Sequence, residues 1–274
     1  MDRPIADVLV KGRCAPEHGA HVIVSSRKID DCQLVADNIS SEGGSAEALA
    51  CHVGNMEDIA LCFDHIKTKH KKLDILINNA ATNPYFGHIL DTDLGAFTKT
   101  MDVNVFAMAH ILRYVLPHLR KQQSGHIINT ASMMGYMSYP GNGSYSASKY
   151  AVIGLSEALA QEVRPFGIKV TILVPGTFRT NFMNEDTLNV AQHKIDAYNL
   201  DTQVEQFTGL DGKQLGNPKK LALVVIKLPE MPNPPLHLPL GSDSYRAIVE
   251  VRKNEKKEME EWKTLSLSTD FKKK

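Results

Sequence analysis

A tyrosine and a lysine four positions apart, Tyr145 and Lys149, are the residues of this 274-residue chain whose types and spacing best fit a chemical role. Four residues make about one helical turn, so the two side chains project from the same face of a helix. A phenol has a pKa of about 10, and a neighbouring ammonium group favours its ionised form. Such a pair could exchange a proton with an alcohol or a carbonyl near neutral pH. The same spacing also occurs by chance on helices, so the pair alone does not establish a site.

A serine precedes the tyrosine by thirteen residues. Ser132 ends the segment HIINTAS, residues 126–132, whose apolar β-branched character predicts a strand. At the carboxyl end of that strand its hydroxyl could hydrogen-bond the same substrate oxygen as Tyr145. The alternative is a strand-end hydroxyl that is satisfied within the fold.

The elements that would position these residues follow from an alternation of short apolar runs and helical stripes. Strands are predicted at residues 21–25, 45–53, 73–80, 126–132 and 168–174. Helices are predicted at residues 29–40, 56–66, 93–120 with a bend at Pro117, and 145–163. This order predicts a doubly wound parallel α/β sheet with helices on both faces. The nearly apolar run at 73–80 indicates a strand buried on both faces.

The carboxyl-terminal third has a looser pattern. We expect a polar helical stretch over residues 184–207, a helix starting at Asn217-Pro218 and a last short strand within residues 229–242. A charged helix and tail then follow. The sequence thus predicts one domain, with residues 1–240 forming the sheet and residues 241–274 a helical extension of it.

Several motifs, in order, resemble the short-chain dehydrogenase/reductase (SDR) family. The segment NNAA, residues 78–81, is similar to the family's N-N-A-G motif, and Asn104 stands where the family has a helix asparagine. Ser132, Tyr145 and Lys149 match its Ser-Tyr-Lys triad. Pro175-Gly176, with Thr180, resembles its P-G-x-x-x-T element. The resemblance covers about residues 19–240, and the ordered combination is far more specific than any one motif.

The resemblance implies a Rossmann-type fold and a hydride transfer between a nicotinamide and a substrate carbon. Tyr145 would be the acid/base, Lys149 would lower its pKa and bind the nicotinamide ribose, and Ser132 would orient the carbonyl. Asn104 would hold a relay water. The expected cofactor-binding residues are Gly12, Ser26, Arg27, Val53, Asn79, Ala80, Tyr145, Lys149, Pro175, Gly176 and Thr180.

The choice of cofactor depends on the end of the strand at residues 21–25, which corresponds to the second strand of the family. A carboxylate at this position would select NAD(H). The segment Ser25-Ser26-Arg27 has hydroxyls and a guanidinium instead, which could clamp a 2′-phosphate. We therefore expect NADP(H) rather than NAD(H). The alternative is that Arg27 only covers a solvent-facing strand end.

The chain departs from the family at its first β-α-β unit. The family's T-G-x-x-x-G-x-G loop is reduced to Lys11-Gly12, and only the ten residues KGRCAPEHGA separate the first two apolar runs. A parallel crossover ordinarily needs about a dozen residues or more. The glycine-rich loop and the first helix are therefore expected to be missing. His52 also replaces the acid that the family uses near the adenine.

Two interpretations remain open. The first is an NADP(H)-dependent oxidoreductase that acts on a carbonyl or secondary alcohol, with a substrate pocket lined by residues 82–88 and the segment after Thr180. The second is a non-catalytic or cofactor-impaired homologue that acts through binding or oligomerisation. A serine hydrolase is disfavoured because the sequence has no G-x-S-x-G motif. The family resemblance also implies a homodimer or homotetramer formed through the helices at 93–120 and 145–163.

Composition narrows the possible partners. The chain has 31 Lys plus Arg and 31 Asp plus Glu residues, so it has no net positive charge that would attract nucleic acid. No apolar run is long enough for a membrane span or signal peptide. The four cysteines lack C-x-x-C spacing, and no histidine group has the spacing of a zinc site, so we expect a cytoplasmic protein without a metal site.

Overall fold

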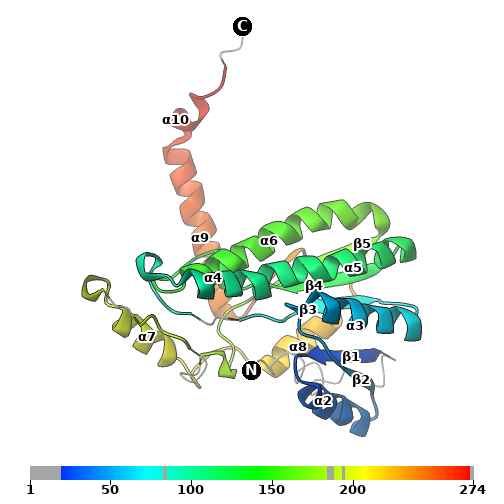
Figure 1. Cartoon of the computed structure of the whole chain (residues 1–274). Helices are drawn as coiled ribbons and strands as arrows, with labels where there is room; N and C mark the ends of the chain where they lie inside the picture. Colours follow the sequence, from blue (N-terminus) through cyan, green and yellow to red (C-terminus); the bar gives the residue numbers. More distant parts are fainter. Residues whose placement is uncertain (1–19, 83–84, 184–187, 193–194, 272–274) are drawn as a thin grey trace.

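The computed structural model describes residues 20–271, apart from 83–84, 184–187 and 193–194 (Figure 1). Gly12 and the shortened first unit up to residue 19 therefore lie outside the described residues. The loss of the glycine-rich loop from this part of the chain therefore remains a prediction from the sequence.

The described strands are all parallel and form two sheets. One sheet pairs β1 (His21–Ser26) with β2 (Ser45–Ala50). The other has the order β3 (Ile75–Asn78), β4 (Gly125–Thr130), β5 (Ile168–Pro175) and β6 (His237–Leu240). Every strand predicted from the sequence is present, so the parallel α/β architecture is confirmed.

Helices cover both faces of both sheets. The helices of the sheet region are α2 (Ile29–Ser41), α3 (Met56–Lys69), α4 (Leu94–Met101), α5 (Ala107–Gln122), α6 (Gly143–Val163) and α8 (Pro218–Lys227). In β4, Ile127 packs in the cluster with α5 and α6, while its neighbour Ile128 packs in the cluster with α8. In β1, Val24 packs on α2 and Ile23 on the cluster of α3. Since successive strand residues point to opposite faces, the sheets are doubly wound.

The prediction that the third described strand is buried on both faces is wrong. In β3, Ile75 is 38% exposed and the remaining residues are only half-buried. Among the described residues β3 pairs with β4 alone, and β1 pairs with β2 alone, so β3 lies at the edge of its sheet. The apolar side chains of β3 are therefore only partly buried by the strands and helices that the structure describes.

The predicted long helix at 93–120 is interrupted. The chain forms α4, then a π-helical segment, η3 (Asp102–Phe106), and then α5, which contains Pro117. π-Helical turns inside α-helices are rare and often mark functional sites. The interruption places Asn104 within the π segment and not in a regular helix.

Polar caps explain where several helices begin. Asn55 accepts a hydrogen bond from the amide of Glu57 at the start of α3, and Asn217 accepts from the amides of Lys219 and Lys220 at the start of α8. These caps satisfy amides that have no partner within the helix. Asn217 and Pro218 therefore start a helix as predicted.

Within its described residues, the segment predicted to be helical after β5 is helical only in part. Of residues 184–207, the structure describes a short turn, η8 (Asp196–Tyr198), and the beginning of α7 (Leu200–Thr208). Other single turns are η2 (Ile89–Asp91), η4 (Met133–Gly135), η5 (Arg164–Phe166) and η6 (Asn181–Met183).

The carboxyl-terminal extension is a helix, as predicted. α9 (Ser242–Glu261) and α10 (Lys263–Leu267) lead away from the sheets (Figure 1). At the start of α9, the Ser244 hydroxyl donates to the Val174 carbonyl at 2.7 Å. In the middle of the helix, the Arg252 guanidinium lies 5.2 Å from the Tyr136 ring centroid. Among the described helices, none combines the length and apolar character that a membrane crossing requires.

Candidate functional site

A cleft of about 600 Å³ opens where β4 and β5 end. Ligands of doubly wound sheets bind at the carboxyl ends of the strands, so this is the expected position of a site. The cleft brings together residues that the sequence placed far apart. The predicted site residues that line it are Asn79, Ser132, Tyr145, Lys149, Pro175, Gly176 and Thr180.

Tyr145 and Lys149 share one turn of α6, and both are buried. The Lys149 side chain is 2% exposed, and its ammonium donates to the Thr130 carbonyl at 3.0 Å. The same ammonium lies 5.5 Å from the centroid of the Tyr145 ring, and the centroids of the Tyr145 and Phe182 rings are 5.7 Å apart. The end of β4 thus holds a buried cation beside the phenol, as the predicted pairing requires.

Ser132 follows β4 and caps the short turn η4. Its Oγ accepts a hydrogen bond from the Met134 amide at 3.2 Å. Because Oγ is the acceptor in this bond, the hydroxyl hydrogen remains available to a group in the cleft. Both interpretations of this serine therefore hold: it is a capping residue and it faces the cleft.

Asn104 does not line the cleft, but it is joined to the tyrosine turn. Its Nδ2 donates to the Thr82 carbonyl and to the Ser148 hydroxyl, each at 2.9 Å, and its Oδ1 accepts from the Thr82 amide at 2.7 Å. The Ser148 hydroxyl in turn donates to the Tyr145 carbonyl at 2.7 Å. The asparagine therefore links the loop after β3 to the turn of α6 that carries Tyr145.

Asp243 is a cleft residue that the sequence did not reveal. Its Oδ2 accepts from the Thr177 amide at 2.7 Å and the Thr177 hydroxyl at 2.6 Å, and its Oδ1 accepts from the Ser244 amide at 2.9 Å. Burial works to raise the pKa of this carboxyl, but the hydrogen bonds outweigh burial and lower it. Asp243 thereby fixes the Pro175-Gly176-Thr177 turn from the first turn of α9. The only signal in the sequence was its place just after the last predicted strand.

Gly176 is required by this arrangement. A Cβ at this position would lie 2.2 Å from Asp243 Oδ1, far inside van der Waals contact. The absence of a side chain thus lets the Asp243 carboxylate approach the backbone closely.

The other predicted cofactor residues lie outside the cleft. Ser26 ends β1, and its hydroxyl accepts from the Lys28 amide at 3.4 Å and from the Cys32 thiol at 3.1 Å near the start of α2. Arg27 is exposed and has no hydrogen bond or ion pair within the described residues. Val53 is half-buried after β2, and Ala80 is exposed after β3. Among the described residues, Arg27 therefore has no partner that would compete with an anionic group.

The outer wall of the cleft is largely apolar. Phe86, from the predicted loop at 82–88, and Phe182 and Met183, after Thr180, line it as expected. The sequence did not predict that α7 and η4 also line the cleft. Their lining residues are Gln203, Gln206 and Phe207 of α7 and Met133 and Met134 of η4. An amphipathic helix such as α7 gives no sign in the sequence of which surface it will cover.

Comparison with known proteins gives a consistent result. The family model described as short chain dehydrogenase matches residues 13–191. The Mus musculus protein Dehydrogenase/reductase SDR family member 4 is 36% identical over 166 residues, which are 61% of this chain. This match spans 60% of the length of the mouse protein.

Two solved structures are similar to this fold over nearly all of both chains. A short-chain dehydrogenase from Streptomyces avermitilis aligns with a TM-score of 0.83 and 29% identity, and covers 94% of this chain and 93% of that one. A metagenomic short-chain oxidoreductase in complex with NADP aligns with a TM-score of 0.66 and 22% identity, and covers 86% of this chain and 90% of that one. The second likeness concerns the fold alone.

Proposed function

Because the chain belongs to the short chain dehydrogenase family, we propose that it is an oxidoreductase that transfers a hydride between NADP(H) and a carbonyl or secondary alcohol. The observation that carries this proposal is the placement of Ser132, Tyr145 and Lys149 on one cleft. The Pro175-Gly176 turn forms part of the same cleft, so the groups for proton exchange and for cofactor contact face a common space.

The proposed proton chemistry belongs to three side chains. In the reducing direction the Tyr145 hydroxyl donates its proton to the substrate oxygen, and in the oxidising direction the phenolate accepts it. Lys149, held by the Thr130 carbonyl at 3.0 Å, supplies the fixed positive charge beside the phenol. The Ser132 hydroxyl orients the substrate oxygen through its remaining hydrogen. The nicotinamide, when bound, supplies or takes the hydride.

The cleft and its rim fit a nicotinamide cofactor. Gly176 presents no side chain to the cleft, which leaves room for the nicotinamide ring, and Lys149 and Asn79 offer polar groups to the adjoining ribose. Just after β1, the exposed Arg27 guanidinium can bind a 2′-phosphate in a bidentate manner. No carboxylate stands beside it in the segment Ser25-Ser26-Arg27, so we propose NADP(H) over NAD(H). The metagenomic oxidoreductase of the same fold was solved with NADP.

The alternative is a homologue that binds the cofactor weakly or not at all. The observation in its favour is the ten-residue spacing KGRCAPEHGA between the first two apolar runs. The amides of a glycine-rich loop and a helix amino terminus ordinarily bind the pyrophosphate. With this loop reduced to Lys11-Gly12, the affinity for the cofactor is proposed to be lower than a complete loop would give.

The test of the proposed chemistry is the oxidation of NADPH in the presence of a small dicarbonyl. Tyr145→Phe removes the proton donor and should abolish turnover while NADPH still binds. Tyr150→Phe is the matched control, because Tyr150 lies on the same helix but is exposed and outside the cleft. Turnover that persists in Tyr145→Phe would refute the assigned proton donor.

A further inference from the structure

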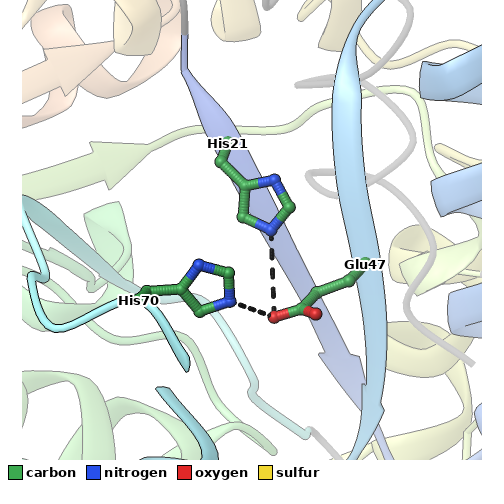
Figure 2. Close-up of side chains that lie close together, drawn as sticks. All are labelled: His21, Glu47 and His70. Carbon is green, nitrogen blue, oxygen red and sulfur yellow. Dashed lines mark hydrogen bonds and ion pairs between the residues drawn. The ribbon is translucent and has the colours of Figure 1, made fainter. Parts of the chain in front are cut away.

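Three histidines converge on one carboxylate at the end of the β1–β2 sheet away from the cleft. His21 begins β1, Glu47 lies near the start of β2, and His70 directly follows α3 (Figure 2). His65 lies in the last turns of α3. The Nε2 atoms of His21, His65 and His70 lie 3.8, 3.3 and 2.5 Å from the same oxygen, Glu47 Oε1. We call these four residues the imidazole–carboxylate cluster.

The register of the two strands explains the convergence. His21 pairs with Ser45, and Ile23 pairs with Glu47. Side chains alternate between the faces of a sheet, so His21 and Glu47 are diagonal neighbours on one face. The end of α3 crosses this face and adds the two remaining imidazoles. Residues separated by more than 40 positions in the sequence thus form one compact group.

The distances suit a small divalent ion. One ligand atom from each of His21, Glu47 and His70 lies within 4.8 Å of the others. Zinc bonds of about 2.0–2.2 Å at a tetrahedral angle separate two ligand atoms by about 3.3 Å. The observed separations from Glu47 Oε1, 2.5 to 3.8 Å, bracket this value, so small side-chain rotations would complete the geometry.

The imidazoles are oriented for coordination through Nε2. The Nδ1 atom of His21 lies 2.7 Å from the Ser45 hydroxyl, and a hydrogen bond there fixes the ring and leaves Nε2 for a ligand bond. His65 Nε2 is buried and has no hydrogen-bond partner among the described residues, although it faces Glu47 Oε1. A buried polar atom without a hydrogen bond is costly, and an ion would satisfy it.

Lys69 is the feature that opposes a metal, because its ammonium pairs with Glu47. That contact is made to Oε2, whereas the three imidazoles face Oε1. The lysine side chain is 55% exposed on a flexible stem, so it can withdraw or remain on the second oxygen. The ion pair and a metal bond therefore use different atoms of the carboxylate.

We propose that the imidazole–carboxylate cluster binds one divalent transition-metal ion such as Zn²⁺ through His21, Glu47 and His70, with His65 beside the same carboxylate oxygen. This proposal differs from the expectation from sequence spacing that the chain has no metal site, and that expectation stays a prediction. The ion would join β1, β2 and α3. Because β1 and β2 pair only with each other among the described strands, and a two-stranded sheet is marginally stable, the role of the ion would be structural.

The test uses the full chain after removal of metals with a chelator. Titration with ZnCl2 should show one tightly bound ion per chain by calorimetry, and the ion should raise the Tm. Titration with Co²⁺ should give the intense visible bands of a tetrahedral ion without the ultraviolet band of thiolate ligation. This last feature distinguishes the cluster from the four cysteines of the chain.

Variants locate the site. Glu47→Gln and His70→Ala should weaken Zn²⁺ binding by ~100-fold or more, since a direct ligand matters at least as much as its supporting groups. His21→Gln, at an exposed strand start, is the mildest change and should weaken binding by at least ~10-fold in a folded protein. His118→Ala, on α5 and outside the cluster, should leave it unchanged.

Three outcomes would overturn the proposal. They are the absence of a stoichiometric Zn²⁺ site in the unmodified chain, equal affinity in folded His21→Gln and His118→Ala, and a cobalt spectrum with thiolate ligation.

Discussion

Asn104 acts on the site through another residue. The family resemblance implies a role in holding a relay water, but its amide is engaged with Thr82 and with Ser148. Ser148 then bonds the carbonyl of Tyr145 at 2.7 Å. At the scale of single residues, the position of Tyr145, the proposed acid/base, therefore depends on a hydrogen-bonded chain that begins in the loop after β3. The water-holding role stays a proposal.

His126 shows how burial changes the chemistry of a single residue. It is buried in β4, its Nε2 lies 2.9 Å from the Thr171 hydroxyl, and its Nδ1 has no partner among the described residues. Burial, with a smaller effect from the Lys169 ammonium, lowers its pKa from 6.5 to about 4. The folded chain therefore keeps this imidazole neutral in a pH range where the unfolded chain protonates it.

The sign of the resulting pH dependence follows from linkage. Between pH 6.5 and about 4 the unfolded state binds the proton and the folded state does not, so the free energy of unfolding should fall as the pH falls through this window. His126→Gln should make this decline shallower, as measured by urea unfolding at several pH values. His118→Gln is the control. An unchanged slope in His126→Gln would contradict the assignment.

At the scale of elements, the turn after β5 and the start of α9 form one unit around Asp243. In Gly176→Ala the new methyl group would collide with a carboxylate that three hydrogen bonds hold in place. We expect a loss of about 1–3 kcal/mol in the free energy of unfolding, together with weaker cofactor binding. Thermal unfolding and NADPH titration measure the two effects.

Gly154→Ala is the matched control for that substitution. Gly154 lies within α6, and a Cβ there would meet no atom within 4 Å. Alanine in a helix interior should stabilise the protein by about 0.5–1 kcal/mol. If both substitutions changed stability equally, the contact between Gly176 and Asp243 would not be the cause.

Local sequence patterns predicted most helices and strands correctly, because these elements depend on the periodicity of apolar residues and on capping residues. The strands, the start of α8 at Asn217 and the Tyr145–Lys149 turn could all be read from neighbouring residues. The π segment at Asn104 could not, since it accompanies contacts with Thr82 and Ser148 that exist only in the folded chain. The position of Asp243 in the cleft could not be predicted for the same reason.

The imidazole–carboxylate cluster could not be predicted from local sequence patterns either. Its members come from β1, β2 and α3, and their convergence requires both the parallel register of the strands and the crossing of the helix. Spacing along the sequence cannot reveal such a group. The exposed edge of β3 was also hidden, because the burial of a strand depends on which strands pair with it.

At the scale of the whole molecule, exposed apolar side chains on α5, α6 and the π segment support the proposed dimer or tetramer. They include Phe106, Tyr114, Tyr150 and Leu155. Light scattering should give two or four times the chain mass of 30.3 kDa. Phe106→Asp combined with Leu155→Asp should produce monomers, because a buried charge without a partner is costly.

Leu61→Asp serves as the control for oligomerisation, since Leu61 is more exposed than Phe106 and Leu155 but lies on α3. It should leave the assembly intact. A single-chain mass for the unmodified protein would contradict the proposed oligomer.

The proposed oxidoreductase requires above all that the chain hold NADP(H) despite its shortened first unit. The most direct measurement is a titration with NADPH and with NADH, followed by nicotinamide fluorescence, in the unmodified chain and in Arg27→Ala. We predict saturable binding, with NADPH preferred by ~10-fold or more, and loss of that preference in Arg27→Ala because the charge-assisted hydrogen bonds to the 2′-phosphate are gone. The absence of binding up to about millimolar cofactor, above the range usual for enzymes, would contradict the proposed function.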